Sequence, residues 1–187
     1  LLVNPSPQNK IETVSRIMAD FPGFKDNPEE IAIAADIIER LAGDVEVAVR
    51  QAIAWQVAHS PILTVDVAER LAADVASVAF PILRYAQLPE ETLLEAVQAN
   101  DPRKTLAVAG RRNVSATVSE AIIATANVKA ITVLMGNATA TITTPALHRV
   151  LDQYGIIPAV SGAMAKRPEL TADIVTRLVA QVSEGVR

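Results

Sequence analysis

One nearly repeated heptapeptide constrains the fold of this chain more than any other feature of its sequence. The segment "ERLAGDV" runs from Glu39 to Val45, and "ERLAADV" runs from Glu69 to Val75. Six of the seven letters match at an offset of thirty residues. A short unit that recurs at a fixed spacing is typical of proteins in which each unit packs against its neighbours.

Further correspondences extend the repeat along the chain. The segment "AHSPILTVDV" (58–67) aligns with "AKRPELTADI" (165–174), and "AGRRNVSATV" (109–118) fits the same frame. A parallel series of Asp and Asn residues has spacings of 30, 27 and 26 residues: Asp44, Asp74, Asp101 and Asn127. The unit therefore recurs through most of the chain.

The residues of each unit predict helices and their ends. The Asp and Asn series, like Thr64, Ser115 and Thr171, precedes apolar stretches with a helical period, where a side-chain oxygen can cap the first turn. Prolines stand at expected first helical positions: Pro28, Pro102 and Pro145. Alternating strand patterns are missing from the sequence. We expect twelve helices, at about 9–20, 28–42, 45–59, 65–73, 75–87, 89–99, 102–111, 116–126, 128–136, 145–154, 157–166 and 172–184.

Helix pairs of this length cannot bury their apolar faces alone, so neighbouring pairs must stack. The sequence therefore predicts an all-α protein, an α-solenoid (α-α superhelix) of short helical repeats with at least about two-thirds helix. We expect one domain over residues 1–187, with an N-terminal capping helix and linker at 1–26 and stacked helix pairs at 27–187. The matching leucines Leu41 and Leu71 should both be buried.

The segment "LAGDVEVAVRQAIAWQVA" (41–58) resembles a HEAT-type repeat, with Asp at the turn between helices and Val-Arg five and six residues later. More closely, "RLAADVASVAFPIL", "LLEAVQANDPRKTLAVAGRRNVSATVSEAII" and "LTADIVTRLV" resemble a bacterial HEAT-like-repeat family catalogued only as a domain of unknown function. The resemblance covers about residues 33–182 and implies a repeat fold without an established activity. The chain departs from the pattern at Arg50, which Phe80 and then Ala107 replace in later units.

Composition restricts the class of protein. Half of the residues are apolar but only 3% are aromatic, so small and medium side chains must build the core. There is no cysteine, which excludes disulfides and thiolate metal sites and fits a cytoplasmic protein. No apolar run approaches the roughly 20 residues of a membrane-spanning helix, and "LLVNPSPQNK" lacks the pattern of a signal peptide.

Charge is distributed unevenly. Up to Leu94 there are seven Lys or Arg against fourteen Asp or Glu, and from Glu95 onward ten against seven. Such asymmetry can steer partners or favour head-to-tail contacts, or it can be ordinary surface variation.

The sequence offers little for catalysis. The two histidines, His59 and His148, have no metal-ligand spacing, and nucleophile-elbow, P-loop and dinucleotide motifs are missing. Paired acids such as Glu29-Glu30 fit helix N-termini, where negative charge is stabilising. We therefore expect a non-enzymatic protein without metal or cofactor.

A group of basic residues gives the candidate partner-binding site. Two of them open one predicted helix, two end it, and two occupy the matching end of a later unit. They are Arg103, Lys104, Arg111, Arg112, Lys166 and Arg167. Stabilisation of helix C-termini is the alternative explanation.

Trp55 is interpreted as a core residue, with an exposed binding anchor as the alternative, since Trp is frequent among binding hot spots. The leading hypothesis is a protein–protein interaction or scaffold module that binds a protein or peptide. The alternative is a regulatory or nucleic-acid-binding module that uses the basic edge from Arg103 to Arg112. Nucleic acid is disfavoured by a pI of about 5.2 and few aromatic residues.

Overall fold

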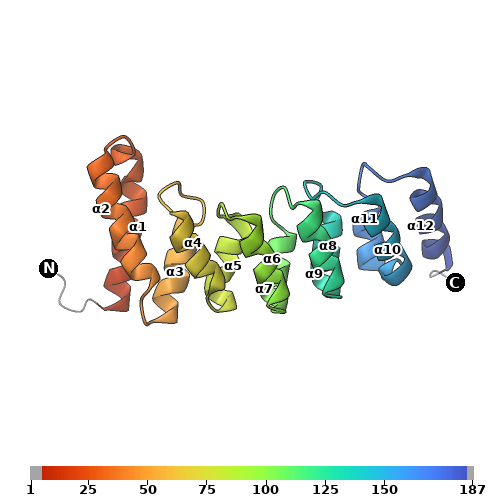
Figure 1. Ribbon diagram of the computed structural model, residues 1–187, viewed down its shortest axis with the longest axis horizontal. Helices are drawn as coiled ribbons and strands as arrows, with labels where there is room; N and C mark the ends of the chain where they lie inside the picture. The colour runs from red at the N-terminus through yellow and green to blue at the C-terminus, as the bar shows by residue number, and fades with distance from the viewer. Residues whose placement is uncertain (1–5, 185–187) are drawn as a thin grey trace. The chain divides into compact units, whose positions relative to one another are not determined.

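The computed structural model of the protein describes residues 6–184, and these residues are mainly helical (Figure 1). Helices make up 72% of them, and they contain no strand. The prediction of an all-α protein with at least two-thirds helix is therefore confirmed. The expectation of no signal peptide falls partly on residues 1–5, which lie outside the described residues.

The helices follow one another along the chain with short connections. Within the described residues they are α1 (Pro7–Phe24), α2 (Pro28–Ala42), α3 (Val47–Val57), α4 (Val65–Ala73), α5 (Ala76–Tyr85), α6 (Glu90–Gln98), α7 (Pro102–Ala109), α8 (Ala116–Ala124), α9 (Val128–Gly136), α10 (Thr144–Tyr154), α11 (Pro158–Met164) and α12 (Ala172–Glu184). The predicted ends agree within two residues except at α1. That helix continues through Pro22 to Phe24, because a proline near the last turn removes only one backbone hydrogen bond.

Most of the predicted capping residues do cap helices. The side chains of Thr64, Ser115, Asp101 and Asn127 accept hydrogen bonds from backbone N–H groups in the first turns of α4, α8, α7 and α9. The Thr171 hydroxyl accepts one from Ile174 at the start of α12. Short polar side chains therefore set these helix starts, as the sequence predicts.

The prediction that Asp44 and Asp74 are N-caps is wrong. The N-cap of α3 is Glu46 and that of α5 is Val75, and neither uses a side-chain capping bond. Asp44 and Asp74 stand just before these positions and bind basic side chains of neighbouring helices instead.

The chain divides into two compact units, and the division falls within α6. Unit 1 is Leu1–Thr92 and unit 2 is Leu93–Arg187. The division coincides with the charge asymmetry, because unit 1 holds the seven basic and fourteen acidic residues of the N-terminal part. The expectation of one domain over 1–187 stays a prediction.

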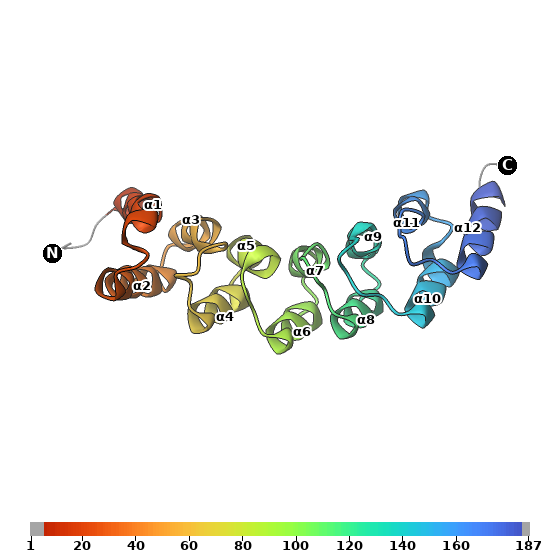
Figure 2. The same ribbon diagram turned by 90° about the horizontal axis from the view of Figure 1, so that it is seen from above.

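In unit 1, α1, α3 and α5 pack side by side in one layer, and α2 and α4 pack in a second layer (Figure 2). Contacts of α2 with α3 and of α4 with α5 join the two layers. Aliphatic side chains that are fully excluded from water fill the space between them: Val49, Ile53, Leu71, Val78 and Ile82. Burial of this apolar surface holds the unit together.

Unit 2 repeats the arrangement. Its first layer contains α7, α9 and α11, while α8 and α10 form the second, and α12 packs against α10 and α11. Its fully buried side chains include Ile122, Ile131, Leu134, Leu147 and Leu151.

The two leucines of the heptapeptide differ in burial. Leu71 is completely buried, as predicted, whereas Leu41 is only half-buried. The expectation that both leucines are buried is therefore wrong for Leu41, which shows that the two heptapeptides are not equivalent in packing.

No helix in the described part of the chain combines the length and the apolar character needed to cross a membrane.

Candidate functional site

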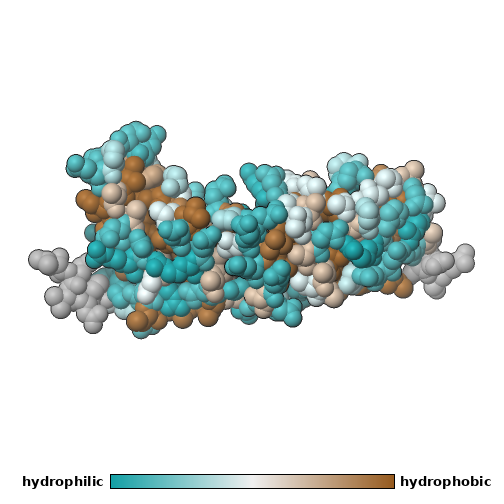
Figure 3. All heavy atoms as spheres, viewed as in Figure 1, coloured by the Kyte–Doolittle hydropathy of each residue, from teal (hydrophilic) through white to brown (hydrophobic). Residues whose placement is uncertain are grey.

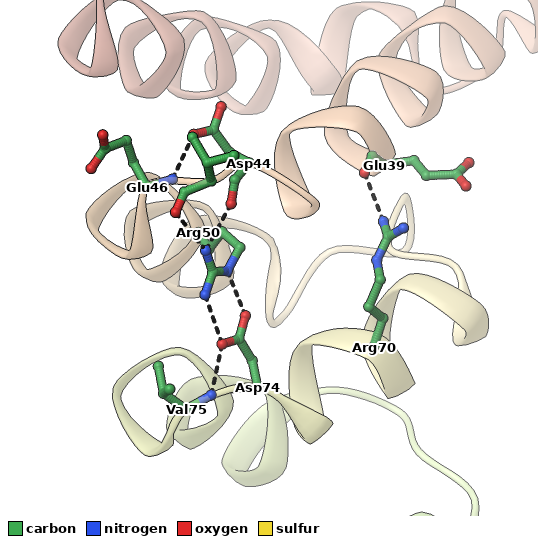
Figure 4. Close-up of polar contacts among 8 residues, drawn as sticks. Glu39, Asp44, Glu46, Arg50, Arg70, Asp74 and Val75 are labelled. Carbon is green, nitrogen blue, oxygen red and sulfur yellow. Dashed lines mark hydrogen bonds and ion pairs between the residues drawn. The ribbon is translucent and has the colours of Figure 1, made fainter.

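Arg50 on α3 forms the best-connected polar contact of unit 1 (Figure 4). Its Nε and Nη2 atoms donate to the two carboxylate oxygens of Asp74, at 2.6 and 2.9 Å. Its Nη1 atom donates to the carbonyl oxygen of Asp44 at 2.7 Å. The hydrogen bond to Asp74 raises the pKa of Arg50. One guanidinium thus links the turn before α3 to the turn before α5.

A similar contact at Asp44 links α1 to the turn before α3. The Asp44 Oδ2 atom accepts a hydrogen bond from Lys10 Nζ at 2.6 Å, and the Oδ1 atom accepts one from the Glu46 N–H at 2.9 Å. Burial alone would raise the pKa of Asp44, but these two bonds and the positive charges of Lys10 and Arg50 together outweigh burial, so the pKa lies below its usual value. Together, Lys10, Asp44, Arg50 and Asp74 connect α1, α3 and α5.

Arg70 adds a contact between the two heptapeptides. Its Nη2 atom donates to the carbonyl oxygen of Glu39 at 2.7 Å, which ties α4 to the last turns of α2 (Figure 4). The "ERLAGDV" and "ERLAADV" segments, which are similar in sequence, are therefore also in direct contact. These contacts give the repeated segments a structural role.

In unit 2, one amide side chain and one buried arginine link successive turns. The Asn137 side chain donates to the carbonyl oxygens of Ala109 and Arg111, at 3.0 and 2.6 Å. The Arg167 guanidinium donates to the carbonyl oxygens that end α9 and follow it, including Asn137 at 3.0 Å and Ala140 at 2.8 Å. The turns after α7, α9 and α11 are therefore bound to one another.

This geometry divides the predicted basic site. Arg103 and Lys104 begin α7, whereas Arg111 and Arg112 follow its other end, so the pairs lie at opposite ends of the helix. The structure brings together the turns that carry Arg111 and Arg167, through Asn137.

Burial divides the same residues again. The exposed ones are Arg103, Arg112 and Lys166, Arg111 is half-buried, and Lys104 and Arg167 are buried. The side chain of Arg167 is only 2% exposed and also pairs with Glu169. A partner could not reach its charge, so we leave Arg167 and Lys104 out of any proposed surface.

The structure shows an aromatic cluster that the sequence analysis missed. Trp55 is 48% exposed and Tyr85 is 41% exposed, so the interpretation of Trp55 as core is wrong and the alternative of an exposed side chain is correct. The Trp55 ring centroid lies 6.2 Å from that of Phe80 and 6.3 Å from that of Tyr85. The ring centroids of His59 and Tyr85 lie 4.4 Å apart. We call Trp55, His59, Phe80 and Tyr85 the aromatic cluster.

The repeat offset could have revealed this cluster. Trp55 and Tyr85 are thirty residues apart, the same offset as the two heptapeptides, so they occupy equivalent positions near the ends of α3 and α5. Because α3 and α5 pack side by side, equivalent positions meet in space. The core interpretation of Trp55 rests on its apolar neighbours Ala52, Ile53 and Ala58. Of these, Ile53 and Ala58 are indeed buried, whereas Trp55 is not.

A surface pocket of about 650 Å³ lies in unit 2, between α8 and α10. Its lining includes Glu120, Arg149 and Tyr154. Arg149 pairs with Glu120, which also accepts a hydrogen bond from Thr143 at 3.0 Å. The charges of the pocket are therefore mutually satisfied, and nothing in its lining resembles a catalytic pair.

Metal ligands do not gather in the described part of the chain, since no group of three or more His, Cys, Asp or Glu side chains there could hold an ion.

Comparison with known proteins identifies a family without giving an activity. No curated protein and no solved structure matches the chain. One family, described as "Uncharacterised protein conserved in bacteria (DUF2336)", matches residues 78–187. This match covers α6 to α12 and most of α5, whereas the expected resemblance began near residue 33 and included α3. Because the match spans more than half of the 187 residues, the chain belongs to this bacterial family.

Proposed function

We propose that the protein is a non-enzymatic interaction module, an α-solenoid of HEAT-like helix pairs that presents a surface to another protein. The cysteine-free sequence fits a cytoplasmic place of work. The layered packing of helices within each unit supports the repeat architecture, as does the network of Lys10, Asp44, Arg50 and Asp74 that links one repeat to the next.

The aromatic cluster is the observation that carries the proposal. The chain has only six Phe, Trp and Tyr residues, and three of them meet on α3 and α5. Large apolar rings gain stability from burial, and two of these three are more than two-fifths exposed. Aromatic side chains dominate the energetics of protein interfaces. A surface that exposes them on a rigid pair of helices is suited to binding a protein.

Affinity capture from a lysate of the source bacterium tests the proposal when wild type is compared with a double variant, Trp55→Ala with Tyr85→Ala. Both side chains are exposed, so the variant should keep the helical circular dichroism of the wild type. We expect wild type to retain a defined set of proteins and the double variant to lose them.

Val45→Ala is the matched control, since Val45 is 88% exposed in the same unit but lies in the α2–α3 turn. Figure 3 shows hydrophobic residues at the lower edge of unit 1, where this turn lies. The control should retain the same proteins as wild type. Equal retention by all three proteins would refute the aromatic cluster as the interaction surface.

The alternative is nucleic-acid binding through the basic residues of unit 2. Arg103, Arg112 and Lys166 are exposed, and unit 2 has ten basic against seven acidic residues. Binding to phosphates requires a continuous basic surface and depends strongly on salt. If labelled DNA or RNA bound wild type and not an Arg103→Glu, Arg112→Glu variant, this alternative would replace the proposed function.

A further inference from the structure

The partner of the aromatic cluster can be inferred from the charges around it. The turns α1–α2, α3–α4 and α5–α6 lie at the same end of unit 1, the upper end in Figure 1. Trp55 and Tyr85 lie in the last turns of α3 and α5, and His59 follows α3, so the cluster belongs to this upper end.

Exposed carboxylates lie at the same end of unit 1 as the cluster. They lie in the turn before α2 or in the first turns of α2, α4 and α6: Asp26, Glu29, Glu30, Asp66, Glu90 and Glu91. Two basic residues lie at the same end: Lys25 in the turn before α2 and Arg84 in the last turn of α5. The upper end therefore has an excess of negative charge next to exposed aromatic rings.

At the other end of unit 1, charged side chains form ion pairs. There, Lys10 pairs with Asp44 and Arg50 pairs with Asp74. Among the described residues, the six carboxylates of the upper end take part in no ion pair. Five of them stand in first helical turns, where the helix dipole stabilises them. That stabilisation explains their positions but leaves their charges facing water.

One ring of the cluster already holds a cation. The Arg84 guanidinium carbon lies 5.9 Å from the centroid of the Tyr85 ring, within the range of a cation–π contact. Trp gives the strongest cation–π contacts of the three aromatic side chains, and Trp55 is half exposed beside Tyr85. Arginine combines this stacking with paired hydrogen bonds to carboxylates.

Building on the proposed function, we propose that the upper end of unit 1 binds a segment of a partner protein that is rich in arginine and lysine. The basic side chains stack on Trp55 and Tyr85 and pair with the carboxylates at the same end of the unit. Long-range attraction to the acidic unit accelerates encounter, and contact with the rings holds the segment in place.

Trp55 provides the measurement, because it is the single tryptophan of the chain. The full chain is titrated with three peptides of about twelve residues, in which serine alternates with arginine, with glutamate or with leucine. We expect the arginine peptide to change Trp55 fluorescence in a saturable way and the other two to have no effect. Raising NaCl from about 50 to about 300 mM should weaken binding several-fold.

Variants separate the rings from the charges, with fluorescein-labelled peptide and anisotropy as the readout. Trp55→Ala with Tyr85→Ala should weaken binding of the arginine peptide about tenfold. Glu29→Gln, Glu30→Gln, Glu90→Gln and Glu91→Gln together should weaken it several-fold and preserve the helical circular dichroism. Asp36→Asn is the control, since it removes an exposed acid already paired with Arg40, and it should bind like wild type.

Three results would overturn the inference. Equal binding of the arginine peptide by wild type and the double aromatic variant would mean general attraction to an acidic protein. Binding of the leucine peptide alone, lost in the double variant, would leave the proposed function standing but assign an apolar partner. A wild-type dimer in sedimentation that the double variant does not form would assign a second copy of the chain.

Discussion

At the scale of single residues, Arg50 shows how one side chain can join the turns before two packed helices, α3 and α5. Its fork geometry suits both a carboxylate and a carbonyl oxygen, and it binds Asp74 and the backbone of Asp44 at once. The side chains of Arg50 and Asp74 are about 16% and 15% exposed, so water screens their pairing only weakly. An exposed pair such as Arg40 and Asp36 has the same chemistry without this burial.

Arg50→Met should therefore lower the free energy of unfolding by about 2–3 kcal/mol, because Asp74 loses two charged hydrogen bonds in a partly buried place. Arg40→Met is the control and should change it by less than about 0.5 kcal/mol. Urea unfolding followed by circular dichroism measures both. Equal effects would show that the contact between Arg50 and Asp74 does not stabilise the packing of α3 on α5.

The lowered pKa of Asp44 predicts that the stability of the protein depends on pH. Because this pKa is lower in the folded than in the unfolded protein, the contact adds stability above the unfolded pKa of about 4. That contribution is lost as the pH falls through the folded pKa. Lys10→Met should therefore destabilise the protein at about pH 7 more than at about pH 3, in urea unfolding at both values. A pH-independent effect would contradict the assigned cause.

At the scale of helices, the sequence predicts most of the element boundaries because the caps and the apolar period agree. Asp101, Asn127, Ser115 and Thr64 stand beside the helices that they cap, so local chemistry is sufficient. Asp44 and Asp74 have the same local pattern but bind residues 34 and 24 positions away. Those contacts depend on helix packing, which local sequence does not determine.

The candidate site was harder to predict for the same reason. Arg167 looks like a surface cation at a helix end, yet it is buried and donates hydrogen bonds to carbonyl groups in the last turn of α9 and after it. Trp55 looks like a core residue in the helical pattern, yet it faces water beside Tyr85. Whether a large amphipathic side chain is buried depends on which neighbouring helix lies opposite, and that is a property of the assembled fold.

The two heptapeptide leucines give a prediction at this scale. Leu71→Ala should cost about 2–5 kcal/mol of unfolding free energy, because it leaves a cavity in a fully buried site. Leu41→Ala should cost less, about 1–2 kcal/mol, because Leu41 is only partly buried before the change. Urea unfolding of the two variants under one condition gives the comparison. A larger loss at Leu41 would contradict the burial difference.

At the scale of the whole molecule, each of the two units has a core of its own and its own balance of charge. The proposed aromatic surface lies in unit 1, whereas the family match lies mainly in unit 2. If helix pairs contact mainly their neighbours, stability should be a sum of local terms rather than a property of one core.

Hydrogen exchange on the Leu71→Ala protein tests this repeat architecture most directly, with backbone protection measured helix by helix against wild type. We predict a graded loss of protection, largest in α3, α4 and α5, smaller in α1 and α2, and smallest in α10 to α12. The gradient follows because each pair is stabilised by its nearest neighbours. An equal loss of protection in every helix would mean one cooperative core and would contradict the stacked-repeat account.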